Sequence, residues 1–292
     1  DRVQDLNDRE SLEQIKTHIT ELAGKGGGVV VFTPQNTSFS AKYANKNKWL
    51  ALQLANLDMD ELVGILPGLT EAQQRVMDVA FRYWKEKYSA PHDIQDLMGL
   101  LNNLETLKLW DKLSPGESNA LKEGSANIAA IRLRRMINEA QSFYSAAVGS
   151  PTDVRDMVGI PGQPGRIVII DLQGLTDTAR QLIVALISSE LLKAAGNRQN
   201  PIRPAFIVYE EGHNFAPAGE ITISKNVIKR IASEGRKFGV GFAIISQRPS
   251  KLDSDVTSQC NTIVAMRIKN PDDQRFIQKT SDYFSAADLA EL

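Results

Sequence analysis

Short apolar runs alternate along this chain with longer stretches in which apolar residues recur at helical spacing. Three of the short runs, each bounded by polar residues, are Ala205–Tyr209, Val240–Ile245 and Thr262–Ala265. The first two are rich in β-branched or aromatic residues, and we interpret all three as buried strands. Two further runs, at 29–32 and 166–171, predict strands near the start and in the middle of the chain.

Helical spacing of apolar residues predicts the elements between these runs. A stripe of Leu12, Ile15, Ile19 and Leu22 predicts a helix over residues 8–23, and glycines at 24–28 end it. Residues 177–195 are apolar on most faces, which predicts a largely buried helix. Further helices are predicted at Glu71–Lys87, Asp93–Leu107, Ser118–Ala147, Ile223–Glu234, Pro271–Lys279 and Ser285–Leu292.

The order of these elements predicts an α/β fold, with a mostly parallel sheet flanked by helices. Residues 58–147 contain no convincing strand, so we interpret residues 58–150 as an inserted helical subdomain. Residues 1–57 and 151–292 then supply the core of the sheet. Residues 149–165, rich in glycine and proline, predict a connector between the insertion and the core.

Composition places the chain among ordinary globular proteins. It has 292 residues, of which 42% are hydrophobic and 24% are charged. The apolar runs are too short for a membrane span, and no signal-peptide pattern opens the chain. The single cysteine, Cys260, excludes an internal disulfide and fits a reducing cytoplasm, where we expect it to be a buried structural thiol. The first residue is Asp1, so we expect the sequence to be part of a longer polypeptide.

The net charge of −1 does not by itself indicate nucleic-acid binding. The window from Lys225 to Lys251 is nevertheless basic, because it holds seven Lys and Arg residues and one acid, Glu234. Attraction to phosphates is local, so such a window can bind DNA in a neutral chain. A solvated helix face is the alternative interpretation.

Polar residues follow two of the predicted strands and carry the candidate chemistry. Glu210 and Glu211 end the first strand, and Gln247 follows the second. In an open parallel sheet, ligands bind beyond the carboxyl ends of the strands. Adjacent carboxylates in nucleotide hydrolases hold Mg²⁺ through water and polarise the water that attacks the γ-phosphate. A neighbouring glutamine can touch both that phosphate and that water. The alternative is a charged turn without catalytic function.

The glycine-rich stretch at 24–28 does not form a phosphate-binding loop. Such a loop requires a strand, the pattern G-x-x-x-x-G-K-[ST] and then a helix. Here a predicted helix comes first and a strand follows, and no Ser or Thr follows Lys25. We therefore interpret the stretch as a turn, and the pattern occurs nowhere else in the chain.

Four segments in fixed order carry a resemblance to a known family. They are EEGHNFAP, EGRKFGVG, SQRPSKLDSDVTSQCNT and NPDDQ. Together they resemble the HerA branch of the FtsK–HerA motor ATPases, which are hexameric DNA translocases of archaea and bacteria. The resemblance is close over residues 165–292 and looser over 28–70. It implies a RecA-like core of the ASCE P-loop NTPase class, without the Walker A segment and with an inserted helical subdomain.

The resemblance also implies functions for single residues. Glu211 corresponds to the general base, Gln247 to the γ-phosphate sensor and Arg236 to a finger that acts across the subunit boundary. Glu210 corresponds to the carboxylate that holds Mg²⁺ through water, although many relatives carry Asp there. A salt bridge from Arg236 to Glu234 or Glu211 is the structural alternative. Arg248 is expected at the nucleotide, and DNA or subunit contacts are expected from Lys225, Lys229, Arg230, Lys237, Lys251 and His213.

The function implied is that of a cytoplasmic ring motor that uses ATP and Mg²⁺ to translocate or unwind double-stranded DNA. The family assembles as a homo-hexamer and works with a NurA-type nuclease in DNA-end processing for recombinational repair. Two alternatives remain open at this point. One is a truncated, non-catalytic binding or oligomerisation module that does not bind ATP. The other is a related pump of the conjugation or secretion type.

Overall fold

The computed structural model describes residues 29–35, 48–54, 57–66, 68–87, 94–103, 123–144, 151–163 and 165–280. The strands in these ranges form two sheets, with the orders β2-β1-β3 and β4-β5. All neighbouring strands pair in parallel. Their bounds are β1 Val29–Thr33, β2 Lys48–Trp49, β3 Ile167–Ile170, β4 Ala205–Tyr209 and β5 Val240–Ile244.

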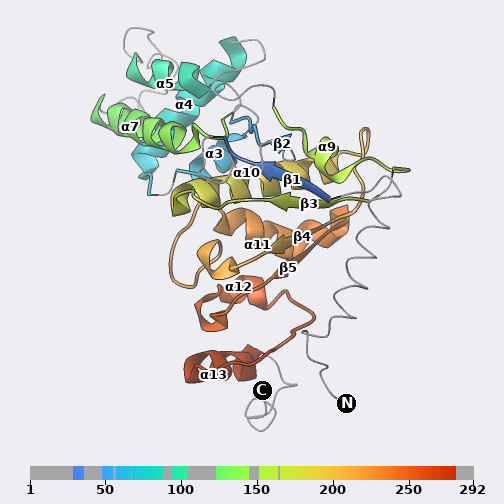
Figure 1. Cartoon of the computed structure of the whole chain (residues 1–292). Helices are drawn as coiled ribbons and strands as arrows, with labels where there is room; N and C mark the ends of the chain where they lie inside the picture. The colour runs from blue at the N-terminus through green and yellow to red at the C-terminus, as the bar shows by residue number, and fades with distance from the viewer. Residues whose placement is uncertain are drawn as a thin grey trace.

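Helices link consecutive parallel strands, as an α/β fold requires. Helix α10 (Asp177–Gly196) connects β3 to β4, and α11 (Lys225–Glu234) connects β4 to β5. Thr176 caps α10, because its side chain accepts a hydrogen bond from the backbone N–H of Ala179. In Figure 1, β1 and β3 lie in front of α10, so the sheet and helix form separate layers.

The remaining described helices are α3 (Met59–Gly64), α4 (Glu71–Lys87), α5 (Ile94–Asn102), α7 (Glu123–Ala140), α9 (Val154–Val158), α12 (Ser254–Thr257) and α13 (Pro271–Thr280), with short 3-10 turns η2 (Gly212–Asn214), η3 (Gly235–Phe238) and η4 (Pro249–Lys251).

Helices α4, α5 and α7 gather at one end of the molecule (Figure 1). Trp84 of α4 and Leu133 of α7 are fully buried there. The same buried cluster includes Leu182 of α10, so these helices and the sheet share one apolar core.

Most expected elements are confirmed within the described residues. Helix α4 has the predicted bounds, and the other predicted helices of the 58–147 region, α5 and α7, end at Asn102 and Ala140, before the predicted ends at Leu107 and Ala147. Helices α3 and α9 were not expected. Helix α9 lies inside the segment that was predicted to be a connector. The predicted helices at 8–23 and 285–292 lie outside the described residues. The division into 1–57, 58–150 and 151–292 stays a prediction.

The third predicted buried strand is wrong. Residues 261–270 contain no strand, and two of the apolar side chains are largely exposed, Val264 at 80% and Met266 at 67%. An extended segment becomes a strand only when a neighbouring strand accepts and donates its backbone hydrogen bonds. In the described part of the chain no strand lies beside this segment, so the apolar pattern alone was insufficient.

Cys260 is only half-buried, in contrast to the buried thiol that we expected. Its Sγ donates to the backbone oxygen of Val256 over 3.7 Å, and burial raises the pKa of the thiol. As for membrane insertion, none of the helices in the described ranges is both long and apolar enough to cross a bilayer.

Helix α11 is fastened to the turn before α12 by a buried ion cluster. Asp253 Oδ2 lies 2.6 Å from Lys225 Nζ, and Asp253 Oδ1 lies 3.3 Å from Lys229 Nζ. Lys229 also contacts Asp255 Oδ2 at 2.7 Å. Burial alone would raise the pKa of Asp253, but hydrogen bonds from the two lysines outweigh it and lower that pKa. The cluster therefore stabilises the fold only while Asp253 is ionised.

We expect Asp253→Asn to lower the free energy of unfolding by about 2 kcal/mol at pH 7, because Lys225, whose side chain is 13% exposed, loses its carboxylate partner and Lys229 loses one of two. Since the folded-state pKa of Asp253 lies below its ordinary value of 3.8, its contribution is present above that pH. The contribution disappears as the pH falls through the folded-state pKa. Urea unfolding at pH 7 and at pH 3 measures both effects.

The matched control is Asp255→Asn, whose carboxylate is 73% exposed and which should change stability by less than about 0.5 kcal/mol. A destabilisation by Asp253→Asn that is as large at pH 3 as at pH 7 would show that lost packing, rather than lost charge, is responsible.

Candidate active site

The register of β4 and β5 brings two polar strand ends together. Tyr209 pairs with Ile244, and the backbone ladder continues as Gly212 N–H donates to the oxygen of Ile245 over 2.8 Å. Both chains therefore leave the sheet side by side. Gln247 Nε2 donates to Glu211 Oε1 over 2.7 Å. Two predicted site residues, 36 positions apart, are thus in direct contact.

Glu211 adopts a backbone conformation that is unfavourable for its residue type. Its φ of 50° makes it the one non-glycine residue with positive φ in the described part of the chain. The next residue must be glycine, because a Cβ on Gly212 would lie 2.1 Å from Cγ1 of Ile244. The tight packing of Gly212 on β5 and the left-handed turn at Glu211 together aim this carboxylate at Gln247. Strain of this kind is found at functional sites.

His213 and Ser246 link the same two strand ends a second time. His213 Nδ1 lies 2.9 Å from Ser246 Oγ, which also accepts a hydrogen bond from the backbone N–H of Arg248 over 3.0 Å. The ring nitrogen lies 3.4 Å from Glu211 Oε2. His213, which was expected to contact DNA or another subunit, therefore lies close to the Glu211 carboxylate. The shorter contact, to Ser246, was not expected.

One oxygen of Glu211 is buried without a hydrogen-bond donor. Oε1 is occupied by Gln247, whereas Oε2 is inaccessible to solvent and has no hydrogen-bond partner. A buried carboxylate oxygen without a donor is costly in a folded protein. The polar group recorded close to this oxygen is the ring nitrogen Nδ1 of His213, at 3.4 Å.

Helix α10 holds the strand end from which these residues extend. The hydroxyl groups of Tyr209 and Ser188 lie 2.9 Å apart in the core, and burial raises the pKa of Tyr209. Gln181 Nε2 donates to the backbone oxygen of Asn214 over 3.0 Å. The turn that carries Glu211 is thus attached to α10 on both sides.

Glu210 is exposed and makes no ion pair within the described residues. No group of three or more His, Cys, Asp and Glu side chains in those residues could hold a metal ion by itself. Mg²⁺ in nucleotide sites commonly uses only one or two protein carboxylates, with water and substrate phosphates as its other ligands. The pair Glu210 and Glu211, with the free oxygen of Glu211, fits an ion bound in that way.

Arg236 lies at the other edge of the sheet from Glu211. It belongs to η3, which precedes the first residue of β5, whereas Gln247 follows the end of β5. A strand of five residues separates the two edges by about 17 Å. Arg236 is exposed and forms no ion pair with Glu234, Glu211 or any other described residue. Its guanidinium group is therefore available to a neighbouring molecule rather than to its own Glu211.

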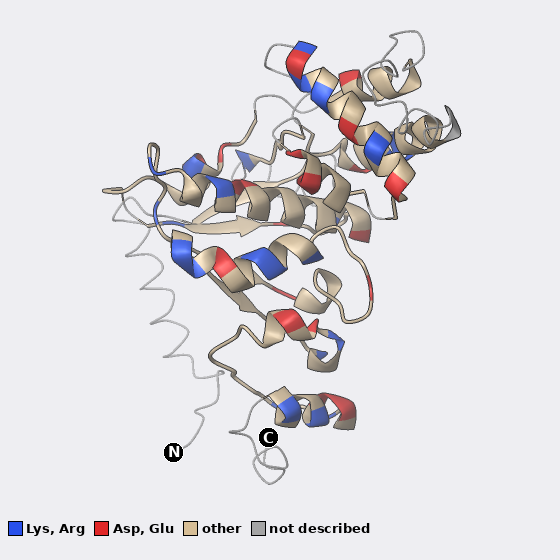
Figure 2. Ribbon diagram, turned by 180° about the vertical axis from the view of Figure 1, so that it is seen from behind, with Lys and Arg blue, Asp and Glu red and all other residues tan. Residues whose placement is uncertain are grey.

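The expected contact residues fall into two groups. Lys225 and Lys229 are engaged by Asp253 and Asp255. Four other side chains are exposed and form no ion pair within the described residues: Arg230, Lys237, Arg248 and Lys251. Figure 2 shows basic and acidic residues interspersed on the visible face, and no continuous basic stripe. A contact with DNA would therefore depend on a few local cations.

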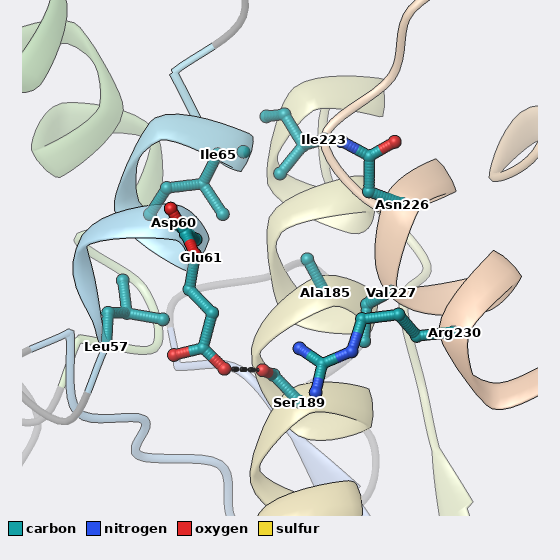
Figure 3. A pocket seen from close by; sticks show the side chains of 11 residues that line it. Leu57, Asp60, Glu61, Ile65, Ala185, Ser189, Ile223, Asn226, Val227 and Arg230 are labelled. Atoms are coloured by element: carbon teal, nitrogen blue, oxygen red, sulfur yellow. Dashed lines mark hydrogen bonds between the residues drawn. The ribbon is translucent and has the colours of Figure 1, made fainter. Parts of the chain in front are cut away.

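A cavity of about 180 Å³ lies between α3, α10 and α11, away from the strand ends. Figure 3 shows Glu61 of α3 and Ser189 of α10 joined by a hydrogen bond, with Arg230 extending toward them from α11. The carboxylate of Glu61 accepts hydrogen bonds from the hydroxyl of Ser189, from Lys193 Nζ and from the backbone N–H of Asp58. Because this carboxylate is fully engaged, it is a structural link between α3 and α10.

Sequence reasoning missed three residues that shape the site: Gly212, Ser246 and Asp253. Gly212 stood within a quoted motif, and its close packing on Ile244 became visible only with the register of β4 and β5. Ser246 directly precedes Gln247, and its position at a strand end was a signal that could have been used. Asp253 gave no signal, because its lysine partners lie on another element.

Comparison with known proteins finds one sequence family and several relatives. The sequence family described as "Helicase HerA, central domain" matches residues 14–191. The DNA double-strand break repair helicase HerA of Pyrococcus furiosus is 28% identical over 308 residues, which cover 89% of this chain and 54% of that protein. The same-named protein of Sulfolobus acidocaldarius is 36% identical over 134 residues, or 44% of this chain and 26% of that protein. The chain thus spans about half the length of the curated relatives first matched.

Among solved structures, the bacterial conjugative coupling protein TrwBdeltaN70 is similar, with a TM-score of 0.46 and 14% identity. The match covers 97% of this chain and 63% of that one.

We expect the backbone strain at Glu211 to be measurable. Glycine adopts the left-handed backbone conformation without an energetic cost, whereas glutamine pays the same cost as glutamate. The free energy of unfolding of Glu211→Gly should therefore be about 1 kcal/mol higher than that of Glu211→Gln. Chemical unfolding of both variants under identical conditions provides the comparison. Equal stabilities would mean that the turn relaxes without strain.

Proposed function

Because this chain belongs to the HerA helicase family, we propose that it is part of the ATP-hydrolysing core of a ring-shaped motor that moves along double-stranded DNA. Its strand ends form the catalytic edge, and ATP is the substrate. The proposal extends to the longer protein, since the chain spans about half of its relatives.

The observation that carries the proposal is the contact between Gln247 and Glu211. Gln247 Nε2 lies 2.7 Å from Glu211 Oε1 and holds that oxygen in place. The other oxygen, Oε2, is buried and has no hydrogen-bond donor. A general base needs a fixed acceptor atom within hydrogen-bonding reach of the water that it activates. The Glu211 carboxylate is held by Gln247, and its side chain is 38% exposed, so a bound water can approach the carboxylate. Gln247, which can touch both the water and the terminal phosphate, is the second polar group at the same point.

Glu210 is the carboxylate that would hold Mg²⁺ through water. When bound, the ion supplies positive charge that neutralises the phosphate oxygens. The protein's own part is to present Glu210 to solvent while Gln247 holds the carboxylate of Glu211. Arg248 follows Gln247 on the same edge and would contact the nucleotide. The two adjacent carboxylates thus have different environments and different functions.

The position of Arg236 supports a ring. Because it lies at the edge opposite to its own catalytic residues, it can neutralise phosphate charge only in a neighbouring subunit. A planar, permanently charged guanidinium group suits that function. A closed ring, which we propose to be a hexamer, gives every site such a neighbour.

We propose that four residues contact DNA or a neighbouring subunit. Three are cations without ion pairs in the described residues, Arg230, Lys237 and Lys251, and the fourth is His213. Lys225 and Lys229 are less available for contacts of this kind, since both bind aspartates within the chain. We place the motor in DNA-end processing for recombinational repair, with a nuclease as partner. The part in repair follows the name of the relative from Pyrococcus furiosus, a DNA double-strand break repair helicase, whereas the end processing and the nuclease follow from the family resemblance alone.

We expect the full-length protein to hydrolyse ATP faster when double-stranded DNA is present, and Glu211→Gln to reduce kcat by at least about 100-fold. The amide keeps the shape of the carboxylate but cannot accept a proton. Steady-state hydrolysis with and without DNA is the measurement, and this 292-residue chain is assayed beside the full-length protein.

Full-length protein that binds no nucleotide in calorimetry would favour a binding or oligomerisation module instead. Activity that depends on DNA but survives Glu211→Gln would remove Glu211 from the function of general base.

Mixing experiments test the trans function of Arg236. We expect Arg236→Ala and Glu211→Gln proteins to be inactive alone, with losses of about 1,000-fold or more for the arginine. Rings that contain both variants should regain activity, because some interfaces then combine an intact Glu211 with an intact Arg236. The control is Arg198→Ala, an exposed cation with no proposed contact, which should stay active. Mixed rings without activity would contradict the assignment.

A further inference from the structure

Two side-chain contacts join the segments that leave β4 and β5. Gln247 Nε2 donates to Glu211 Oε1 over 2.7 Å, and His213 Nδ1 lies 2.9 Å from Ser246 Oγ. Glu211 and His213 belong to the first segment, whereas Ser246 and Gln247 are consecutive on the second. The two segments are therefore connected at neighbouring points. The Glu211 carboxylate has Gln247 at one oxygen and the His213 ring near the other.

The neighbours of the His213 ring indicate which of its nitrogens carries the proton. Ser246 Oγ accepts a hydrogen bond from the backbone N–H of Arg248 and has a second lone pair for another donor. Glu211 Oε2 lies 3.4 Å from Nδ1, too far for a hydrogen bond, and has no donor. A proton on Nδ1 serves Ser246 and places positive charge beside this carboxylate oxygen. A lone pair on Nδ1 would instead face a negative charge and be repelled by it.

Burial supports a fixed ring. The His213 side chain is only 16% exposed, and both of its recorded contacts use Nδ1. In a neutral imidazole one nitrogen donates and the other accepts, and the surrounding hydrogen bonds decide which does so. The arrangement therefore favours the Nδ1–H tautomer. Nε2, on the other side of the ring, stays available for the contact with DNA or a neighbouring subunit proposed above.

We propose that His213, as the Nδ1–H tautomer, is a positioning residue for Glu211. This inference rests on the proposed function, in which Glu211 is the general base. Nδ1–H donates to Ser246 and directs its positive end toward Oε2, while Gln247 holds Oε1. A carboxylate restrained at both oxygens keeps its orientation toward a bound water. Orientation matters because an error of about 1 Å in the placement of a reacting group can cost about 100-fold in rate. His213 thus acts through Glu211 and does not touch the substrate.

Three substitutions at position 213 separate positioning from packing. The amide nitrogen of asparagine is as many bonds from Cα as Nδ1, whereas that of glutamine corresponds to Nε2. We expect His213→Ala and His213→Gln to lower kcat of the full-length protein by at least about 10-fold, with KM for ATP unchanged within about 2-fold. His213→Asn should keep kcat within about 3-fold of the parent value. Equal losses for asparagine and glutamine, or a change in KM alone, would overturn the proposal.

Nitrogen NMR of this chain measures the tautomer without nucleotide. The chain has three histidines, His18, His92 and His213, and the spectrum of His213→Asn identifies the signals of the third. In alkaline buffer, where imidazole is neutral, we expect Nδ1 of His213 to resonate as a protonated ring nitrogen and Nε2 as an unprotonated one. Ser246→Ala removes the acceptor and should give signals averaged between the two tautomers. A parent ring with its proton on Nε2, or already averaged, would overturn the proposal.

The two measurements distinguish this inference from the proposed function. A parent protein that does not hydrolyse ATP would overturn the proposed function, and with it the positioning of a general base. The wrong tautomer in a protein with DNA-stimulated hydrolysis would overturn only the function of His213.

Discussion

The close parallel pairing of β4 with β5 is the constraint on which the candidate site depends. Gly212 packs so tightly on Ile244 that no side chain fits between them, and the backbone ladder continues past the strands to this point. This packing fixes the position, relative to the strand ends, at which Glu211 and Gln247 leave the sheet. Any shift of register by one residue would turn one of the two side chains to the other face and break their contact.

The site combines features that oppose stability. Glu211 has a left-handed backbone, and its Oε2 is buried without a donor. The surrounding structure compensates through the hydroxyl pair of Tyr209 and Ser188 in the core and through the contact between His213 and Ser246. Destabilising features concentrated on one residue, with rigid support around it, are typical of a site that is organised for a ligand.

The sequence predicted those elements whose pattern is local. Strand β4 and helix α4 could be predicted because β-branched runs and helical stripes act within a few residues. The segment around Val264 could not, since strand formation depends on a neighbour that the pattern does not reveal. Lys229 was expected to contact DNA or another subunit, because its aspartate partners are adjacent only in space. Side-by-side placement of Glu211 and Gln247 followed from parallel topology, whereas the partnership of Ser246 with His213 required the observed register.

The ion cluster around Asp253 has a mechanical consequence. It joins the segment that follows Gln247 to the first turns of α11, and α11 continues directly into the turn that carries Arg236. These three parts therefore form a single rigid unit. In the proposed ring, a displacement of the edge that carries Glu211 in one subunit would be transmitted along α11 to Arg236, which faces the next subunit. Communication around a ring would then need no flexible intermediate, only a helix anchored at both ends.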